Sequence, residues 1–156
     1  PNSVVYAEKV LNNSKTDENV KSDAQIIIAR AAIQTGDEAK AHSAYAKLQT
    51  IAQGELAAEA LYYEAYFKNK DAKFETSNEI VQKLAKNYSG YKFFGAKGLI
   101  LMAKNFYGLK DSFQATYILD SVIQNFTDFP DVVSEAKTEL DRIKSEESKT
   151  NSSITN

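Results

Sequence analysis

The sequence of 156 residues contains no cysteine and no tryptophan, and it has only two prolines, six glycines and one histidine. Without cysteine, disulfides and thiol chemistry are excluded, while the redox compartment stays open. One histidine also excludes a histidine-rich metal site. The scarcity of proline and glycine favours helices over a turn-rich β fold. No apolar run approaches the length of a membrane span, so we expect no direct membrane insertion.

Composition and charge exclude two further classes of protein. Hydrophobic residues make up 43% of the chain, which is too many for a disordered protein. The net charge of −2 gives no basic surface for phosphates, so nucleic acid is not an expected partner. The length fits one domain. The chain begins at Pro1 without a signal-peptide pattern, and we expect it to be a fragment of a longer protein.

One spacing of residues occurs three times. A small residue is followed twelve positions later by a second small residue, and four positions further on by a bulky one. The three sets are Ala29, Ala41 and Tyr45; Ala65, Ser77 and Val81; and Ala103, Ala115 and Leu119. Small residues let two helices cross closely, and the bulky residue fills the next contact. The spacing therefore predicts three antiparallel helix pairs.

Helical periodicity and capping residues set the expected boundaries of these pairs. Ser22 and Asp23 suit the start of the first pair, and Gly36 and Asp37 suit its turn. We predict an all-α domain over residues 1–144, followed by a disordered polar tail over 145–156. The predicted elements are a truncated first helix near 3–12, pairs at about 22–52, 55–87 and 92–126, and a capping helix at 131–144.

The chain resembles the tetratricopeptide repeat (TPR) family over about residues 20–126. Its alanines recur after 36 and 38 residues, at Ala29, Ala65 and Ala103, near the family period of about 34. The middle repeat departs from the pattern at Glu64 and Lys68, which an insertion near 71–72 would explain. The best matches are Ala29, Ala32, Gly36, Asp37, Ala41, Tyr45 and Leu48, and in the third repeat Leu99, Met102, Ala103, Phe106, Asp111, Ala115, Leu119 and Val122.

This resemblance implies an α-solenoid that serves as a protein–protein interaction scaffold. The stretches 59–60, 84–88, 96–97, 113–115 and 123–126 are also similar to the C-terminal part of large TPR proteins of the bacterial cell envelope. Relatives of that type scaffold envelope machinery, so the resemblance implies the cell envelope or periplasm, with the cytoplasm as the open alternative.

In the TPR family, the first helix of each pair lines a concave groove that binds peptides. The resemblance therefore implies groove-binding candidates at Arg30, Gln34, Glu59, Tyr62, Tyr66, Lys97, Lys104 and Tyr107, with Ile33 and Ile100 beside them. Some members clamp the carboxylates of a peptide's C-terminus with a fixed Lys/Asn/Arg set. Ile26 and Arg30 occupy the first two of those positions, so that chaperone-tail function is not supported.

The seventeen aromatic residues have two interpretations. Those on helical stripes are expected to pack in the core: Tyr45, Phe74, Phe106, Phe113 and Phe126. Tyr62, Tyr63 and Tyr66 cannot all face one core, because successive residues of a helix point about 100° apart. Tyrosine is common at binding hot spots, so we expect Tyr62 or Tyr66 to contact a ligand in the groove.

No set of residues predicts catalysis. His42 is expected at the surface of a helix. The carboxylate pairs, such as Glu55 with Glu59 and Glu135 with Glu139, are expected on solvated helix faces. No glycine-rich phosphate loop, nucleophile elbow or calcium loop occurs. We therefore predict no catalytic residue, no metal site and no cofactor, and we do not expect an enzyme.

Three hypotheses about function remain. The first is a non-catalytic scaffold that binds a segment of an unidentified protein in its groove. The second is a structural segment of a longer superhelix or a self-assembling array. The third is binding of a glycan or small ligand through exposed tyrosines.

Overall fold

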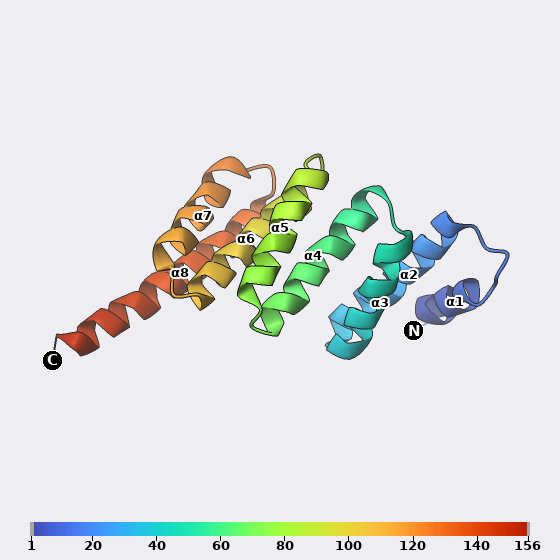
Figure 1. The fold of residues 1–156 in the computed structure, drawn as a ribbon, viewed down its shortest axis with the longest axis horizontal. Helices are drawn as coiled ribbons and strands as arrows, with labels where there is room; N and C mark the ends of the chain where they lie inside the picture. The colour runs from blue at the N-terminus through green and yellow to red at the C-terminus, as the bar shows by residue number, and fades with distance from the viewer. Residues whose placement is uncertain (1, 156) are drawn as a thin grey trace.

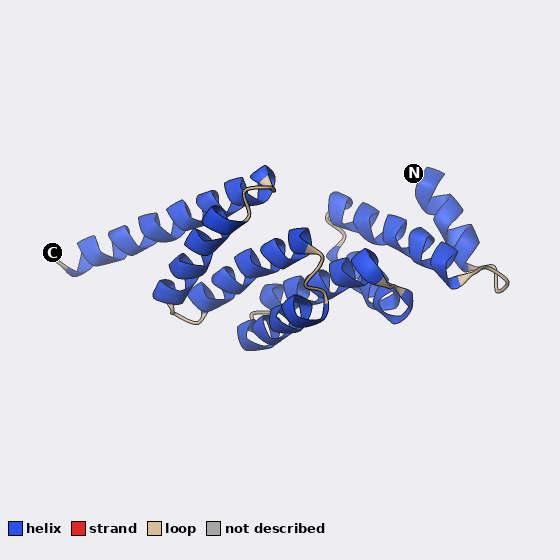
Figure 2. Cartoon of the chain, turned by 90° about the horizontal axis from the view of Figure 1, so that it is seen from above, coloured by secondary structure: helices blue, strands red, loops and turns tan. Residues whose placement is uncertain are grey.

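The computed structural model describes residues 2–155, which form eight α-helices and no strand. The helices follow one another from one end of the molecule to the other, with the termini at opposite ends (Figure 1), and short connections join them (Figure 2). The predicted α-solenoid is confirmed. The helices are α1 (Asn2–Leu11), α2 (Glu18–Thr35), α3 (Glu38–Ile51), α4 (Gly54–Lys70), α5 (Phe74–Asn87), α6 (Lys92–Gly108), α7 (Ser112–Asn125) and α8 (Pro130–Ile154).

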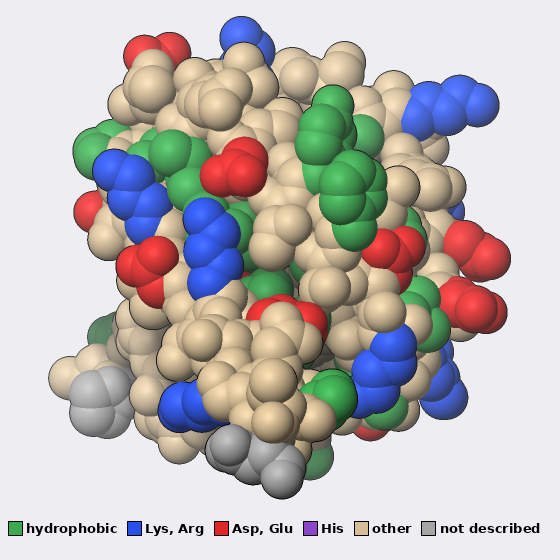
Figure 3. All heavy atoms as spheres, turned by 90° about the vertical axis from the view of Figure 1, so that its left-hand side faces the viewer, with side chains coloured by type: hydrophobic (Ala, Val, Ile, Leu, Met, Phe, Trp, Pro, Cys, Tyr) green, Lys and Arg blue, Asp and Glu red, His purple; other side chains and the backbone are tan. Residues whose placement is uncertain are grey.

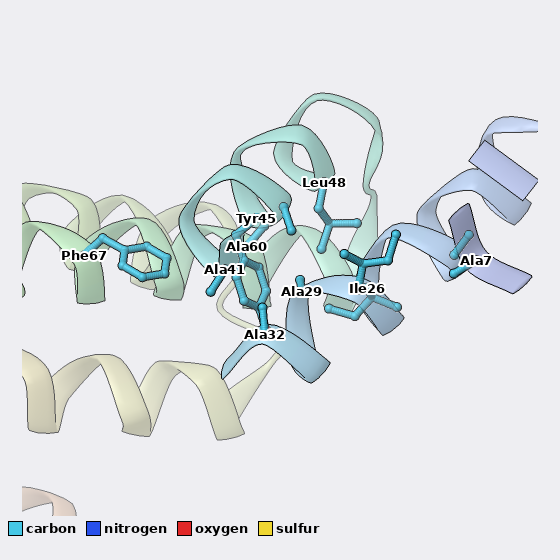
Figure 4. Close-up of a cluster of buried hydrophobic side chains, with 12 residues drawn as sticks. Ala7, Ile26, Ala29, Ala32, Ala41, Tyr45, Leu48, Ala60 and Phe67 are labelled. Atoms are coloured by element: carbon cyan, nitrogen blue, oxygen red, sulfur yellow. The ribbon is translucent and has the colours of Figure 1, made fainter. Parts of the chain in front are cut away.

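The repeated small residues lie where the two helices of a pair cross. All six have no exposed surface: Ala29, Ala41, Ala65, Ser77, Ala103 and Ala115. Figure 4 shows this contact in the first pair, where Ala29 of α2 lies beside side chains of α3. In the second pair the Ser77 hydroxyl donates to the carbonyl oxygen of Ala65 at 2.8 Å. A larger side chain at these positions would push the helix axes apart.

The turns within the three pairs share one backbone geometry. Gly36, Ala72 and Lys110 adopt positive φ values of 73°, 57° and 66°. Each follows the start of its first helix by eighteen residues, counted from Glu18, Gly54 and Lys92. The prediction of an insertion near residues 71–72 is therefore wrong. The additional residues lie between pairs, in the connections 88–91 and 126–129, because the first such connection has only residues 52–53.

The first pair begins earlier than its capping residues predict. The helix α2 starts at Glu18, and the Asp17 carboxylate accepts a hydrogen bond from the backbone N–H of Asn19 at 2.8 Å. Ser22, the predicted start, is buried inside the helix, where its hydroxyl donates to the carbonyl oxygen of Ile51 at 3.3 Å. Several residues of this stretch suit the N-cap of a helix, and packing against α3 determines which of them is used.

The helix α8 corrects the predicted disordered tail, because it continues through residue 154 (Figure 1). Residue 156 lies outside the described part of the chain. No proline or glycine interrupts residues 131–155, and hydroxyls donate back to carbonyls of the preceding turn. These hydroxyls belong to Thr150, Ser152, Ser153 and Thr155.

The helix α8, predicted as a capping helix, differs from α6 at the positions through which α6 packs on α7. Leu99, Ala103 and Phe106 of α6 pack in one cluster with residues of α7. Thirty-eight residues later, exposed Lys137, Asp141 and Lys144 take the corresponding positions on α8. Figure 3 views this end of the molecule and shows charged side chains interspersed with separate hydrophobic patches. At these three positions α8 therefore carries solvated charges where α6 carries packed apolar side chains.

One of the aromatic residues expected in the core lies on the surface. Phe113 is 75% exposed, and Tyr117 beside it on α7 is 66% exposed, whereas Tyr45 is buried. The buried stripe of α7 runs through Ala115 and Leu119. Phe113 lies two residues before Ala115, about 200° around the helix, so it points away from that stripe.

None of the helices in residues 2–155 is both long enough and apolar enough to cross a bilayer.

Candidate functional site

Two adjoining cavities form a groove across the first helices of the pairs. One has a volume of about 370 Å³ and the other about 390 Å³. The walls come from α2, α4 and α6, with Tyr45 of α3 in one cavity and Glu135 of α8 in the other. The residues that line both cavities are Ile33, Tyr62, Tyr63 and Lys97. We call this pair of cavities the groove.

The structure places seven of the eight groove candidates in these walls. The first cavity contains Arg30, Gln34, Glu59, Tyr62 and Lys97, and the second contains Tyr62, Tyr66, Lys97 and Lys104. Ile33 also lines both, whereas Ile100 is fully buried and lines neither. Tyr107 lies outside both cavities, on the α6 surface that faces α8. The family resemblance thus implied the positions, while their partners came only from the structure.

Arg30, Tyr45 and Glu59 form a polar cluster that joins the first two pairs. Glu59 is only 4% exposed. The Arg30 guanidinium donates to both of its carboxylate oxygens, from Nε to Oε1 at 3.0 Å and from Nη2 to Oε2 at 2.6 Å. The Tyr45 hydroxyl donates to Oε1 at 3.0 Å. Such a bidentate, charge-assisted contact fixes geometry as well as energy, so the cluster holds α2, α3 and α4 in register.

The cluster also shifts the pKa of two of its members. The hydrogen bond to Glu59 raises the pKa of Arg30, despite its partial burial. Burial raises the pKa of Tyr45, and the nearby Glu59 carboxylate raises it further. A phenol with a raised pKa stays protonated and keeps donating its hydrogen bond at neutral pH. Glu59 is therefore a structural carboxylate that accepts from two donors, and not an exposed one as expected.

Lys97 makes the corresponding contact between α6 and α8. Its ammonium lies 2.8 Å from Oε2 of Glu135 and 5.7 Å from the centre of the Tyr62 ring. Both charged side chains are partly exposed, so this pair is screened more than the Arg30–Glu59 pair. Positions 59, 97 and 135 are separated by the repeat distance of 38 residues, and each carries a charge that binds a neighbouring pair.

The tyrosines of α4 fill the floor of the groove and contact one another. Tyr62 is buried, whereas Tyr63 and Tyr66 are half-buried. The Tyr63 ring stacks on Tyr45 at 4.2 Å between centroids and meets Tyr66 edge-on at 5.6 Å. Burial raises the pKa of Tyr62 and of Tyr63. The tyrosines therefore serve both as core and as groove wall, because the cavity opens directly above the helix.

Two further lysines line the groove, and they differ in their ion pairing. Lys104 is partly buried and forms no salt bridge within residues 2–155. Lys70 is exposed, and its ammonium lies 3.5 Å from Glu38 and 5.4 Å from the centre of the Tyr66 ring. Neighbouring Tyr66 and Glu38 raise the pKa of Lys70. Lys104 therefore has no carboxylate partner within residues 2–155, whereas Lys70 has Glu38.

Tyr107 has a structural contact in place of the expected exposure to the groove. Its hydroxyl donates to Oε2 of Glu146 at 2.8 Å, and the Arg142 guanidinium lies 5.4 Å from the ring centre. The hydrogen bond to Glu146 raises the pKa of Tyr107. This contact exists because α8 continues beyond residue 144, where a disordered tail was expected.

Sequence reasoning missed several residues of the groove wall: Tyr63, Asn69, Lys70, Leu101 and Glu135. The charge at position 135, one repeat after Lys97, was a usable signal. The role of Asn69 could not be predicted, because a single asparagine in a helix belongs to no repeated sequence pattern. It lies in the wall because its Nδ2 donates to Oδ1 of buried Asn105 at 2.8 Å.

The residues considered for catalysis do not meet in a cleft. His42 is exposed, as expected, and its ring lies 4.8 Å from that of Phe67. Glu59 is bound to Arg30, so it does not form an acid–base pair with Glu55. Within residues 2–155, no three histidine, aspartate or glutamate side chains come together as metal ligands.

Comparisons with known proteins add no family to this picture. No protein-family model matches the chain, and no curated protein matches it either.

Proposed function

We propose that this chain is a non-catalytic protein–protein interaction scaffold of the tetratricopeptide repeat type, which binds a segment of a partner protein in the groove. The observation behind the proposal is the groove itself, two adjoining cavities that run over three helices. The helix pairs, which recur after 36 and 38 residues, support the family assignment. By the same resemblance, we propose that the partner belongs to an assembly of the bacterial cell envelope.

The walls of the groove suit a peptide more than a small molecule. Each cavity is near the lower limit for a ligand pocket, and together they form an elongated trough. Tyrosine rings offer large rigid surfaces with a polar end, which is the chemistry of binding hot spots. The contacts of Glu59 and Glu135 hold the walls in place before binding, so little ordering is required of the protein.

The charged groups of the groove support a role in binding and not in catalysis. Glu59 and Glu135 each accept from a neighbouring cation, so neither is a free general base. We propose no cofactor and no covalent step, and recognition of the segment is the whole function.

The proposal predicts that substitutions in the groove weaken the affinity for the partner segment. Tyr66→Ala and Gln34→Ala change half-buried or exposed side chains, so both variants should stay folded. A segment captured from the source lysate by the wild-type chain, then purified, should bind the double variant at least roughly tenfold more weakly in calorimetry, because a hot-spot ring is lost. The matched control is Lys86→Gln on exposed α5, which should bind as the wild type does. Equal affinity for all three proteins would reject the groove as the binding site.

A second candidate function, self-association, is favoured by exposed Phe113 and Tyr117. The corresponding residues of α5 are Glu75 and Glu79, which stay exposed although α5 has pairs on both sides. A longer array of the same kind would therefore not cover Phe113 and Tyr117. Contiguous exposed aromatics are typical of an interaction surface, here a contact between copies of the chain.

Self-association predicts a mass that depends on concentration. The double variant Phe113→Glu/Tyr117→Glu places glutamates on α7 where α5 carries Glu75 and Glu79. The fold should therefore be retained. Sedimentation velocity should show wild-type oligomers that this double variant loses, since burial of two aromatic rings is removed. A wild-type chain that sediments as a monomer at all concentrations would contradict this second function and leave the groove proposal intact.

A further inference from the structure

A cavity separate from the groove lies between α1, α2 and α3, the three helices at the N-terminal end of the array (Figure 1). Its volume is about 540 Å³, and none of the residues that line it also lines the groove. Buried Gln25, Ile28 and Ala44 form its floor, whereas charged side chains stand at its exposed rim. A cavity of this size can hold a small organic ligand.

Gln25 presents one unused hydrogen-bonding atom at the floor of this cavity. The residue is only 4% exposed. Its Nε2 donates to the carbonyl oxygen of Ala44 at 3.1 Å, and this bond fixes the orientation of the amide. Within residues 2–155 no donor reaches its Oε1, and no unpaired side-chain oxygen there is sealed from solvent, so Oε1 opens into the cavity. A ligand that donates to this oxygen would satisfy a buried acceptor.

Comparison of the three pairs shows that the polar floor departs from the repeat. The equivalent positions of the other two pairs hold a leucine on the first helix and an isoleucine on the second, namely Leu61 with Ile80 and Leu99 with Ile118. In each pair these side chains pack within one hydrophobic cluster. The first pair has polar Gln25 and small Ala44 instead, which leaves space and an acceptor where the others are filled. Such a break in a packing pattern is expected at a functional site.

Two lysines of α3 give the rim of the cavity an excess of positive charge. Lys40 and Lys47 lie two helical turns apart, with Ser43 between them on the same face. Lys47 forms no salt bridge within residues 2–155. Lys40 lies 3.9 Å from the Glu8 carboxylate, and both of these side chains remain about half exposed. One carboxylate thus faces two ammonium groups, and the rim suits an anion.

The floor and the rim together define the chemistry of a ligand. An inorganic anion or a fatty acid would meet the lysines but leave Oε1 of Gln25 without a donor. A neutral sugar would donate a hydroxyl to Gln25 but would not use the lysines. A sugar that carries a carboxylate or a phosphate supplies both groups, and its C–H surface suits Leu11 and Ile28 of the same cavity.

We propose that this cavity binds an anionic sugar, with a hydroxyl that donates to Oε1 of Gln25 and a carboxylate or phosphate that pairs with Lys47 and Lys40. The hydroxyl of Ser43 can donate to the same anion or accept from a second sugar hydroxyl. This site is independent of the proposed function of the groove, because the two share no residue.

Isothermal titration calorimetry of the full chain tests the proposal with glucuronate, glucose 6-phosphate, glucose and acetate. At least one of the two charged sugars should bind with a dissociation constant below roughly 1 mM, about tenfold more tightly than glucose or acetate. This binding should weaken as salt is added, and the tighter of the two charged sugars identifies the anion. Affinity for acetate equal to that for the charged sugars would mean an adventitious ion only and would overturn the proposal. Absence of binding by both charged sugars would also overturn it.

Variants of the floor and the rim locate the binding. Gln25→Leu introduces the residue of the equivalent positions 61 and 99, so the melting temperature should not fall. Its affinity for the charged sugar should decrease at least roughly tenfold, because the acceptor is lost. Lys47→Gln should reduce this affinity roughly fivefold. Its matched control is Lys83→Gln at the equivalent position of α5, which should bind as the wild type does.

Two further comparisons separate this site from the groove. The groove variant Tyr66→Ala/Gln34→Ala should keep the affinity for the charged sugar, and Gln25→Leu should keep the affinity for the partner segment. Wild-type affinity for the sugar in folded Gln25→Leu, or in Lys47→Gln, would overturn the proposed sugar site and leave the groove proposal intact.

Discussion

Replacing Arg30 by methionine should lower the free energy of unfolding by about 2–3 kcal/mol. Methionine keeps the apolar stem of the side chain but removes both donors to Glu59. The Glu59 carboxylate, 4% exposed, then retains only the Tyr45 hydroxyl as partner. A buried charge that loses its counter-charge is more costly than a surface ion pair. We place the effect below that of a fully buried pair because the Arg30 side chain is 55% exposed. Urea denaturation followed by circular dichroism measures the difference.

The matched control is Lys97→Met, which breaks the corresponding contact with Glu135 between α6 and α8. Both of its partners reach solvent, so its loss should cost less than about 1 kcal/mol. If the two variants were equally stable, burial of Glu59 would not be what makes the first contact strong. A second variant, Arg30→Lys, should recover only part of the loss, because lysine cannot donate to both oxygens from a planar fork.

Asn105→Ile should cost about 3 kcal/mol, because it removes the centre of a buried hydrogen-bond network. Asn105 has no exposed surface. Its Nδ2 donates to Oγ of Ser77 at 2.7 Å and to Oδ1 of Asn78 at 2.9 Å, and its Oδ1 accepts from Asn69. With isoleucine at position 105, the side-chain oxygen of Asn78 is left buried without a hydrogen-bond donor. Thermal unfolding and urea denaturation should agree on the loss.

The repeat supplies a control for this variant. The positions that correspond to Asn105 hold Phe67 one repeat earlier and Ile143 one repeat later, so an apolar residue fits the same backbone. Thr116 lies beside Ile143 where Asn78 lies beside Asn105. Adding Asn78→Thr to Asn105→Ile should therefore restore about 1 kcal/mol, since the unpaired amide is removed. A double variant no more stable than Asn105→Ile would show that size and packing, and not hydrogen bonding, set the cost.

These two contacts also explain how the groove keeps its shape. Arg30 and Glu59 join the first pair to the second, and Asn105 joins the second to the third. Neighbouring pairs of a solenoid contact only one another, so small changes at a junction would alter the whole curvature. We expect these side chains to act on binding by positioning the walls of the groove.

Much of the groove wall was expected from the resemblance to the TPR family, combined with the regular spacing of the repeats. Ala29, Ala65 and Ala103 marked equivalent positions on three helices, and the resemblance to the TPR family implied that the next residues, Arg30, Tyr66 and Lys104, line a groove. Their partners could not be predicted in the same way. Glu59 and Glu55 are the same residue type on one helix, yet only Glu59 is buried, because α2 and α3 lie over it.

The errors have a common physical origin. Phe113 is apolar but exposed, and residues 145–154 are polar but helical. Composition predicts burial and order only on average, because a surface aromatic and a polar helix both cost little when nothing in the fold opposes them. The same applies to Ser22, which suits a helix start but is buried within α2.

The sequence by itself determined the repeated helix pairs, the close crossings at small residues and the polar face of the last helix. Each of these depends on the spacing of side chains along one helix, which is a local property. Only the tertiary structure decided which charges are neutralised and which remain free. Glu59 binds Arg30 across 29 residues and Glu135 binds Lys97 across 38, whereas Lys104 has no carboxylate partner within residues 2–155. Charge pairing depends on distance in space, which spacing along the chain does not specify.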